Sequence, residues 1–118
     1  MQSSFSTRFF RILPSERQTI VHVLASLRIK EGHLAEFLEI FKANVPHVLK
    51  EKGCIEYIPA IDLPTDISAQ AVDPNLVTVI EKWESLAALK DHAVAPHMQA
   101  YEKKVKDILE GVSLKILA

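Results

Sequence analysis

The sequence has little cysteine, little glycine and little excess charge of either sign. A single cysteine, Cys54, has no partner for an internal disulfide and no spacing for a zinc site, which favours a reducing compartment and predicts a cytoplasmic protein. Only three glycines occur among 118 residues, and 48% of the residues are hydrophobic. This composition is typical of one well-packed globular domain and not of a disordered or fibrous chain.

The near-neutral charge excludes further classes of function. A formal net charge of −1 leaves no basic face for a run of phosphates, so nucleic acid is not an expected partner. No apolar run approaches the roughly 20 residues that cross a bilayer, so no membrane partner is expected either. Residues 1–18 carry Arg8, Arg11 and Arg17 among serines and phenylalanines. We interpret them as an N-terminal arm before a domain at residues 19–118, with a transit peptide as the alternative.

Hydrophobic periodicity predicts four strands and three helices, the last two of which form one helical region. Strands are expected at residues 20–29, 54–61, 76–83 and 112–117. One helix is expected from about residue 34 to 49, with Pro46 kinking it and Gly53 capping its end. Ser85 caps a short second helix, and Pro96 opens a third whose apolar stripe runs to Leu109 before Gly111 ends it.

The order of these elements predicts an α+β ferredoxin-like βαββαβ fold, with one antiparallel sheet and its helices on one face. The first three strands are largely apolar on both faces, and a bare sheet face would expose more apolar surface than a soluble monomer usually tolerates. We therefore expect a homodimer that forms through the sheet face. The irregular segment between Asp62 and Pro74 is a candidate lid.

Four segments in this order resemble the antibiotic biosynthesis monooxygenase domain of the dimeric α/β-barrel superfamily. They are Ile29–Gly32, Glu51–Tyr57, Glu81–Ser85 with Ala88, Leu89 and His92 after it, and Pro96–His97. The resemblance covers about residues 20–117. It implies a dimer whose two sheets face each other as a barrel, with a pocket between sheet and helices in each protomer. Members of the family include cofactor-free oxygenases of polyketides and quinols, haem-degrading enzymes, and an isomerase of a phosphorylated signal molecule.

The haem-degrading branch is disfavoured residue by residue. Ala25, His92 and Glu102 stand where that branch has an asparagine, a tryptophan and an iron-ligating histidine. The segment between Asp62 and Pro74 also has extra residues compared with most relatives.

His92 and His97 match family positions near the pocket and are the candidate catalytic bases. A neutral imidazole, with an ordinary pKa of about 6.5, can take a proton from a dihydroxy-aromatic substrate and leave an anion that reacts with dioxygen. This chemistry calls for no cofactor, and no trio of residues has the spacing of a metal site. The alternative is that both histidines bind backbone groups at a helix junction.

Further candidates surround these histidines. Glu81 and Trp83 are expected on the same strand face. Glu81 could orient His92 or His97, and Trp83 could stack on a planar substrate. The alternative is that Trp83 is a core residue and that Glu81 forms an interfacial ion pair. The other expected substrate-binding residues are Asn44, which matches a polar position of the signal isomerases, His47 at a pocket mouth, Tyr101, and Ala25 on the pocket face of the first strand. Their alternatives are a surface amide for Asn44 and a core position for Tyr101.

Two functions follow from these residues. The first is a cofactor-independent monooxygenase of a small aromatic or quinol-type substrate, with His92, His97 and Glu81 as the catalytic residues. The alternative is a non-oxidative isomerase or a small-ligand-binding dimeric module of the same fold. A phosphorylated substrate would call for fixed cations, and the nearby Lys82, Lys90 and Lys103 look solvated.

Overall fold

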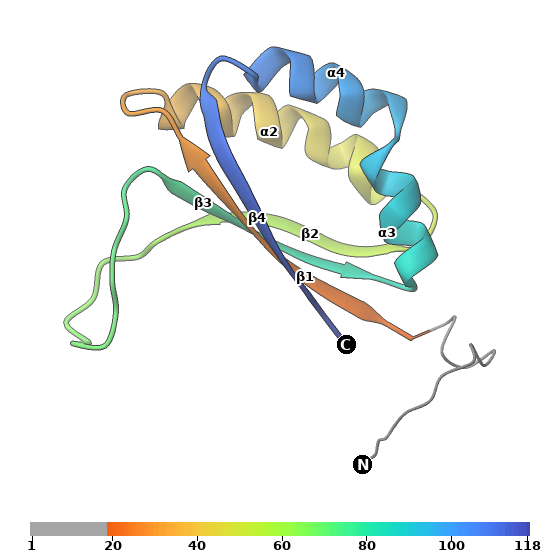
Figure 1. Cartoon of the computed structure of the whole chain (residues 1–118), viewed down its shortest axis with the longest axis horizontal. Helices are drawn as coiled ribbons and strands as arrows, with labels where there is room; N and C mark the ends of the chain where they lie inside the picture. Colours follow the sequence, from red (N-terminus) through yellow and green to blue (C-terminus); the bar gives the residue numbers. More distant parts are fainter. Residues whose placement is uncertain (1–18) are drawn as a thin grey trace, which may run out of the picture.

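The computed structural model describes residues 19–118 and shows a four-stranded antiparallel sheet with three helices (Figure 1). Along the chain lie β1 (Val21–Ile29), α2 (Leu34–Leu49), β2 (Cys54–Ile61), β3 (Leu76–Trp83), α3 (Leu86–Ala93), α4 (Pro96–Val105) and β4 (Leu109–Leu117). The strand order in the sheet is β2-β3-β1-β4, and every pair is antiparallel. The predicted ferredoxin-like α+β fold is confirmed. The arm expected at residues 1–18 lies outside the described residues.

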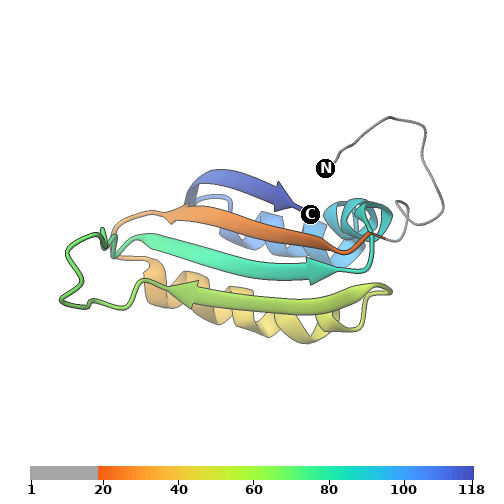
Figure 2. The same ribbon diagram turned by 90° about the horizontal axis from the view of Figure 1, so that it is seen from below.

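The helices cover one face of the sheet and leave the other open, as Figures 1 and 2 show from two directions. Alternating residues of β1 and β3 are buried beneath the helices, as expected for strands with one covered face. The residues between them point to the open face. There Leu24 and Ile80 are partners in the β1–β3 register and stay 38% and 39% exposed.

An aromatic cluster joins α2 and α4 to the sheet. The ring of Phe41 on α2 stacks on Tyr57 of β2, with centroids 5.5 Å apart, and meets the edge of Tyr101 of α4 at 5.7 Å. Phe37, one turn earlier on α2, packs on Phe41 at 5.8 Å. Aromatic pairs at such spacing prefer offset and edge-to-face arrangements, so the cluster fixes both tyrosine rings between helices and sheet.

Gly53 allows α3 to pack closely against the turn that precedes β2. Its φ of +88° is a left-handed conformation that favours glycine, and a Cβ there would lie 2.6 Å from Cβ of Ala88. The carbonyl of Gly53 also accepts a hydrogen bond from the backbone of Glu84 at 2.8 Å. The Ser85 side chain caps α3 by accepting from Ala88 N at 3.1 Å. These contacts fix where α3 begins.

Three details differ from the sequence predictions. The helix predicted to run to Gly111 ends at Val105, because Ile108 turns out of it and its carbonyl accepts a hydrogen bond from Lys30 N at 2.8 Å. The stripe through Ile108 and Leu109 therefore reflects burial at the entry to β4, and Gly111 pairs with Arg28 in the sheet. Helix α2 has the predicted bounds, with Pro46 inside it. Its C-cap is Lys50, so Gly53 belongs to the following turn.

The long connection between β2 and β3 projects from the end of the sheet, on the side away from α3 (Figure 1). Asp73 organises it: its backbone N–H donates to Oδ2 of Asp62 at 2.8 Å, and its carboxylate accepts from Arg28 of β1 at 2.7 Å. Within residues 19–118, no helix has the length and hydropathy needed to cross a bilayer.

Candidate active site

A cavity of about 210 Å³ lies between the covered face of the sheet and the helices. Most of its lining is apolar, including Ala25 of β1 and Met98 of α4. On the β4 side the lining residues Val112 and Leu114 are more than half exposed, so the cavity opens there. Its polar lining residues are Tyr57, Glu81, His92, Tyr101 and Glu102. An apolar hollow with a few convergent polar groups is the usual form of a small-molecule site.

His92 presents one ring nitrogen to a carboxylate. The residue is 5% exposed, and its Nδ1 lies 2.9 Å from Oε2 of Glu51. Because an ionised carboxylate only accepts hydrogen bonds, Nδ1 is the donor, and a neutral ring then carries its lone pair on Nε2. Nε2 has no hydrogen-bond partner among the described residues, and the ring lines the cavity. The arrangement leaves the Nε2 lone pair of a neutral His92 ring available to accept a proton from a molecule in the cavity.

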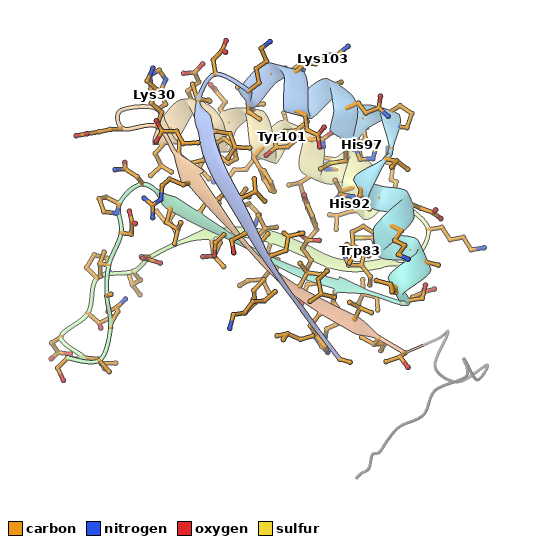
Figure 3. The ribbon with its side chains drawn as sticks, viewed as in Figure 1. Lys30, Trp83, His92, His97, Tyr101 and Lys103 are labelled. Atoms are coloured by element: carbon orange, nitrogen blue, oxygen red, sulfur yellow. The ribbon has the colours of Figure 1, made fainter. Side chains whose placement is uncertain are left out.

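His97 approaches the same carboxylate from α4. Its Nε2 lies 2.7 Å from Oε2 of Glu51, at an angle that does not form a regular hydrogen bond. The chain brings the two histidines together because His92 lies in the last turn of α3 and His97 in the first turn of α4, directly after Pro96. Figure 3 shows both at this junction, with Trp83 on the sheet below them.

Glu81 binds Trp83, not a histidine. The indole Nε1 donates a hydrogen bond to Oε1 of Glu81 at 2.9 Å. Burial raises the pKa of Glu81, while the Trp83 hydrogen bond and the charge of His92 act in the opposite direction. The orienting contact that the sequence suggested for Glu81 is made by Glu51.

Trp83 supports His92 from beneath. Its side chain is fully buried, its ring centroid lies 4.7 Å from that of His92, and it does not line the cavity. Trp83 is therefore a core tryptophan that fixes the plane of the His92 ring. Its indole face does not contact the contents of the cavity.

Two tyrosine hydroxyls complete the polar lining. Burial is the largest cause that raises the pKa of Tyr57 and of Tyr101, so both phenols keep their protons at neutral pH. Neither hydroxyl has a hydrogen-bond partner within residues 19–118. The Tyr57 ring meets the edge of His92, with centroids 5.3 Å apart. Both hydroxyls can therefore donate to an oxygen atom of a bound molecule.

The remaining candidates line a separate groove of about 170 Å³ between α2 and α4. It contains Asn44, His47 and His97, together with Lys104 and one side of Tyr101. The Asn44 amide donates to Sδ of Met98 at 3.3 Å. The structure thus divides the expected site: Ala25, Glu81, His92 and Tyr101 line the cavity, while Asn44, His47 and His97 lie with Tyr101 at the outer groove.

Glu51 is the functional candidate that sequence reasoning missed. It was part of a matched segment, but it lies 41 positions before His92 and has no spacing that marks it. The residues of the β2–β3 connection, the candidate lid, do not line the cavity. Among the described residues, no group of three or more His, Cys, Asp or Glu side chains is arranged to hold a metal ion. Burial raises the pKa of Cys54 to about 11, so its thiol stays protonated at neutral pH.

Comparison with known proteins identifies the family. Residues 20–104 match the model of the family described as antibiotic biosynthesis monooxygenase. The chain belongs to the antibiotic biosynthesis monooxygenase family. It is 42% identical over 98 residues to a protein of Escherichia coli K12 named "Probable quinol monooxygenase YgiN", covering 80% of this chain and 93% of that one.

Solved structures share the family fold at lower identity. A conserved protein of Methanosarcina mazei Go1 superposes with a TM-score of 0.71 at 23% identity, covering 88% of this chain and 96% of that chain. A protein of Pseudomonas aeruginosa gives a TM-score of 0.72 at 24% identity, over 86% of this chain and 94% of the other. At this identity the likeness extends to the fold alone.

Proposed function

We propose that the protein is a monooxygenase that hydroxylates a small quinol-type aromatic in the cavity beneath the helices, with His92 as the base. The observation that carries the proposal is the His92–Glu51 contact, which leaves Nε2 of His92 free at an apolar cavity. The name of the Escherichia coli relative supports a quinol as the substrate class. The proposal includes the cytoplasmic location that the free Cys54 favours.

The size and charge of the cavity favour such a substrate. A dry cavity of roughly 150 Å³ accommodates benzene, so a volume of about 210 Å³ suits a substituted aromatic of one or two rings. No lysine or arginine of the described chain lines the cavity. A phosphorylated substrate, as the isomerase alternative would require, would therefore have no cation to bind it.

Deprotonation is the step that the residues explain best. Nε2 of His92 accepts the proton of one substrate hydroxyl, and the resulting imidazolium lies between Glu51 at Nδ1 and the buried carboxyl group of Glu81. The hydroxyls of Tyr57 and Tyr101 stabilise the substrate anion as hydrogen-bond donors. The apolar lining excludes water, which keeps the anion electron-rich toward dioxygen.

The overall reaction balances with dioxygen as the only co-reactant. One oxygen atom forms a new hydroxyl group on a ring carbon, and the other leaves as water. Two of the four electrons that dioxygen takes up come from the ring C–H bond, and two come from oxidation of the quinol to a quinone. The proton held by His92 returns to oxygen when the water forms.

We further propose that the protein works as a homodimer built on the open face of the sheet. The centre of that face carries Leu24, Ile58 and Ile80, all exposed, with the β1–β3 and β2–β3 registers placing them side by side. A contiguous apolar patch at the centre of a flat surface favours a protein interface. Two-fold symmetry would set this patch against its own copy.

Oxygen uptake with a panel of benzoquinols and naphthoquinols tests the function. The wild type should consume oxygen faster than the quinol autoxidises, and His92→Gln should lose about 100-fold or more in kcat, the usual scale of a general base. His33→Gln is the matched control, because His33 is the N-cap residue of α2, at the end away from Glu51, and its ring binds Glu36 at an exposed position. Uptake no faster than autoxidation, or equal activity in His92→Gln, would contradict the proposal.

A further inference from the structure

We propose that Glu51 is the positioning residue of the site, with His97 holding Glu51 in place, so that His92 alone is the base. The inference rests on the proposed function and makes it more specific, because it divides the two histidines and two carboxylates of the site into separate roles.

The contacts of Glu51 support its role in positioning His92. One oxygen of this carboxylate, Oε2, lies 2.9 Å from Nδ1 of His92 and 2.7 Å from Nε2 of His97. The Glu51 side chain is 15% exposed and follows the C-cap of α2, so it is held between three elements. Shared between two rings at the α3–α4 junction, Oε2 has a fixed position toward His92.

The neighbours of His92 exclude the other candidate for this role. Glu81 is also close, but its Oε1 is occupied by the Trp83 indole, and no hydrogen bond joins it to His92. The remaining ring contacts of His92 are aromatic, with Tyr57 and Trp83. Glu51 is therefore the carboxylate that selects the tautomer of His92, while Glu81 acts only through its charge.

The positions of the two histidines relative to the cavity support His92 as the base. His92 lines the cavity, whereas His97 lines the outer groove and does not reach the cavity. Oε2 of Glu51 lies 2.7 Å from Nε2 of His97, and neither ring nitrogen of His97 has a regular hydrogen-bond partner among residues 19–118. A base that takes a proton from the substrate has to contact the substrate. Because His97 does not line the cavity, it contributes through Glu51.

The expected consequence is a division between kcat and KM. Holding the Nδ1–H tautomer keeps the Nε2 lone pair aimed at the substrate and stabilises the imidazolium that forms on proton transfer. Neither effect changes the binding of the neutral substrate. Loss of the Glu51 charge should therefore lower kcat and leave KM nearly constant.

The test combines three variants with oxygen uptake and nitrogen NMR of the histidines. Glu51→Gln should lose about 100-fold in kcat with KM within about threefold, a scale typical of residues that orient a catalytic group. Its matched control, Glu84→Gln, changes an exposed glutamate close to Gly53 and should leave both constants unchanged. His97→Gln keeps a donor near Oε2 and should lose no more than about tenfold.

Several results would overturn the inference. A kcat of Glu51→Gln within threefold of wild type, or a loss in His97→Gln as large as that of His92→Gln, would do so. The NMR measurement needs neither turnover nor a variant: the neutral form of the His92 ring in the wild type should carry its proton on Nδ1, and a proton on Nε2 would refute the assigned role. Absence of oxygen uptake by the wild type would count against the proposed function, while the tautomer would still decide the role of Glu51.

Discussion

The indole of Trp83 donates a hydrogen bond to the carboxylate of Glu81 over 2.9 Å on the covered face of β3. Burial nevertheless raises the pKa of Glu81 above its ordinary value of 4.5. The folded protein thus holds this proton more tightly than the unfolded chain does. By linkage, stability falls as the pH rises from 4.5 through the folded-state pKa, and the loss is complete above it.

Glu81→Gln should therefore raise the thermal midpoint at pH 7 to 8. The glutamine oxygen still accepts from Trp83, and the cost of burying a charge disappears. The gain should shrink as the pH falls toward 4.5, which thermal melts across this range would show. The exposed Glu39 offers the control, since Glu39→Gln should give no pH-dependent difference of this kind. A variant less stable than wild type at pH 8 would argue against a buried charge at this position.

Gly53→Ala should cost more stability than Gly32→Ala. Both glycines have a φ near +85°, which costs an L-residue about 1 to 2 kcal/mol. Only Gly53 has a neighbour in the way, with Cβ of Ala88 at 2.6 Å, and such overpacking adds about 1 to 3 kcal/mol. Urea titration gives both values. The double variant Gly53→Ala/Ala88→Gly should recover the part of the unfolding free energy that is lost through overpacking. Equal losses of unfolding free energy in the two single variants would show that α3 does not depend on this contact.

Ala25→Leu should block the cavity without unfolding the protein. Ala25 is buried in the cavity wall, and the hollow beside it has room for the added carbons. We expect quinol affinity to fall about tenfold or more, with a thermal midpoint close to that of the wild type. Anaerobic calorimetric titration measures the affinity. Ala35→Leu, on the exposed side of α2, is the control and should bind as the wild type does; unchanged affinity in Ala25→Leu would place the substrate elsewhere.

Ile80→Glu should convert the protein from a dimer to a monomer. Ile80 pairs with Leu24 on one side and Ile58 on the other, so a charge there would be buried at the centre of the proposed interface. Light scattering coupled to gel filtration gives the mass of each species. Val94→Glu introduces the same charge at an exposed apolar residue between α3 and α4, and this variant should remain a dimer. A wild type that is monomeric at micromolar concentration would rule out the proposed interface.

Much of the fold could be predicted because its elements carry local signals. Alternation along β1 and β3, the Ser85 cap and Pro96 at the first turn of α4 each act within a few residues, and the structure places the elements accordingly. The end of α4 could not be predicted in this way. Ile108 and Leu109 continue a helical stripe in sequence, but their burial comes from the pairing of β4 with β1, which is a tertiary contact.

Two sequence signals point to residues that line the cavity: strand alternation, and the family resemblance that singles out His92. Glu81 and Ala25 face the cavity because the period of two fixes their side of the sheet. The contact of Glu51 with His92 depends on how α3 packs against the turn after α2, and no spacing in the sequence encodes that angle. The same holds for His97, which the junction at Pro96 turns to the outer groove.

Anaerobic NMR titration of the wild type with a naphthoquinol, followed through assigned backbone and histidine signals, shows whether the quinol binds in the cavity beside His92. We expect the shifted signals to cluster at the cavity, on His92, Tyr101 and Ala25, and the ring nitrogens of His92 to change while those of the solvent-facing His33 do not. Shifts confined to the outer groove or to the open face of the sheet, with His92 unperturbed, would contradict binding in the cavity.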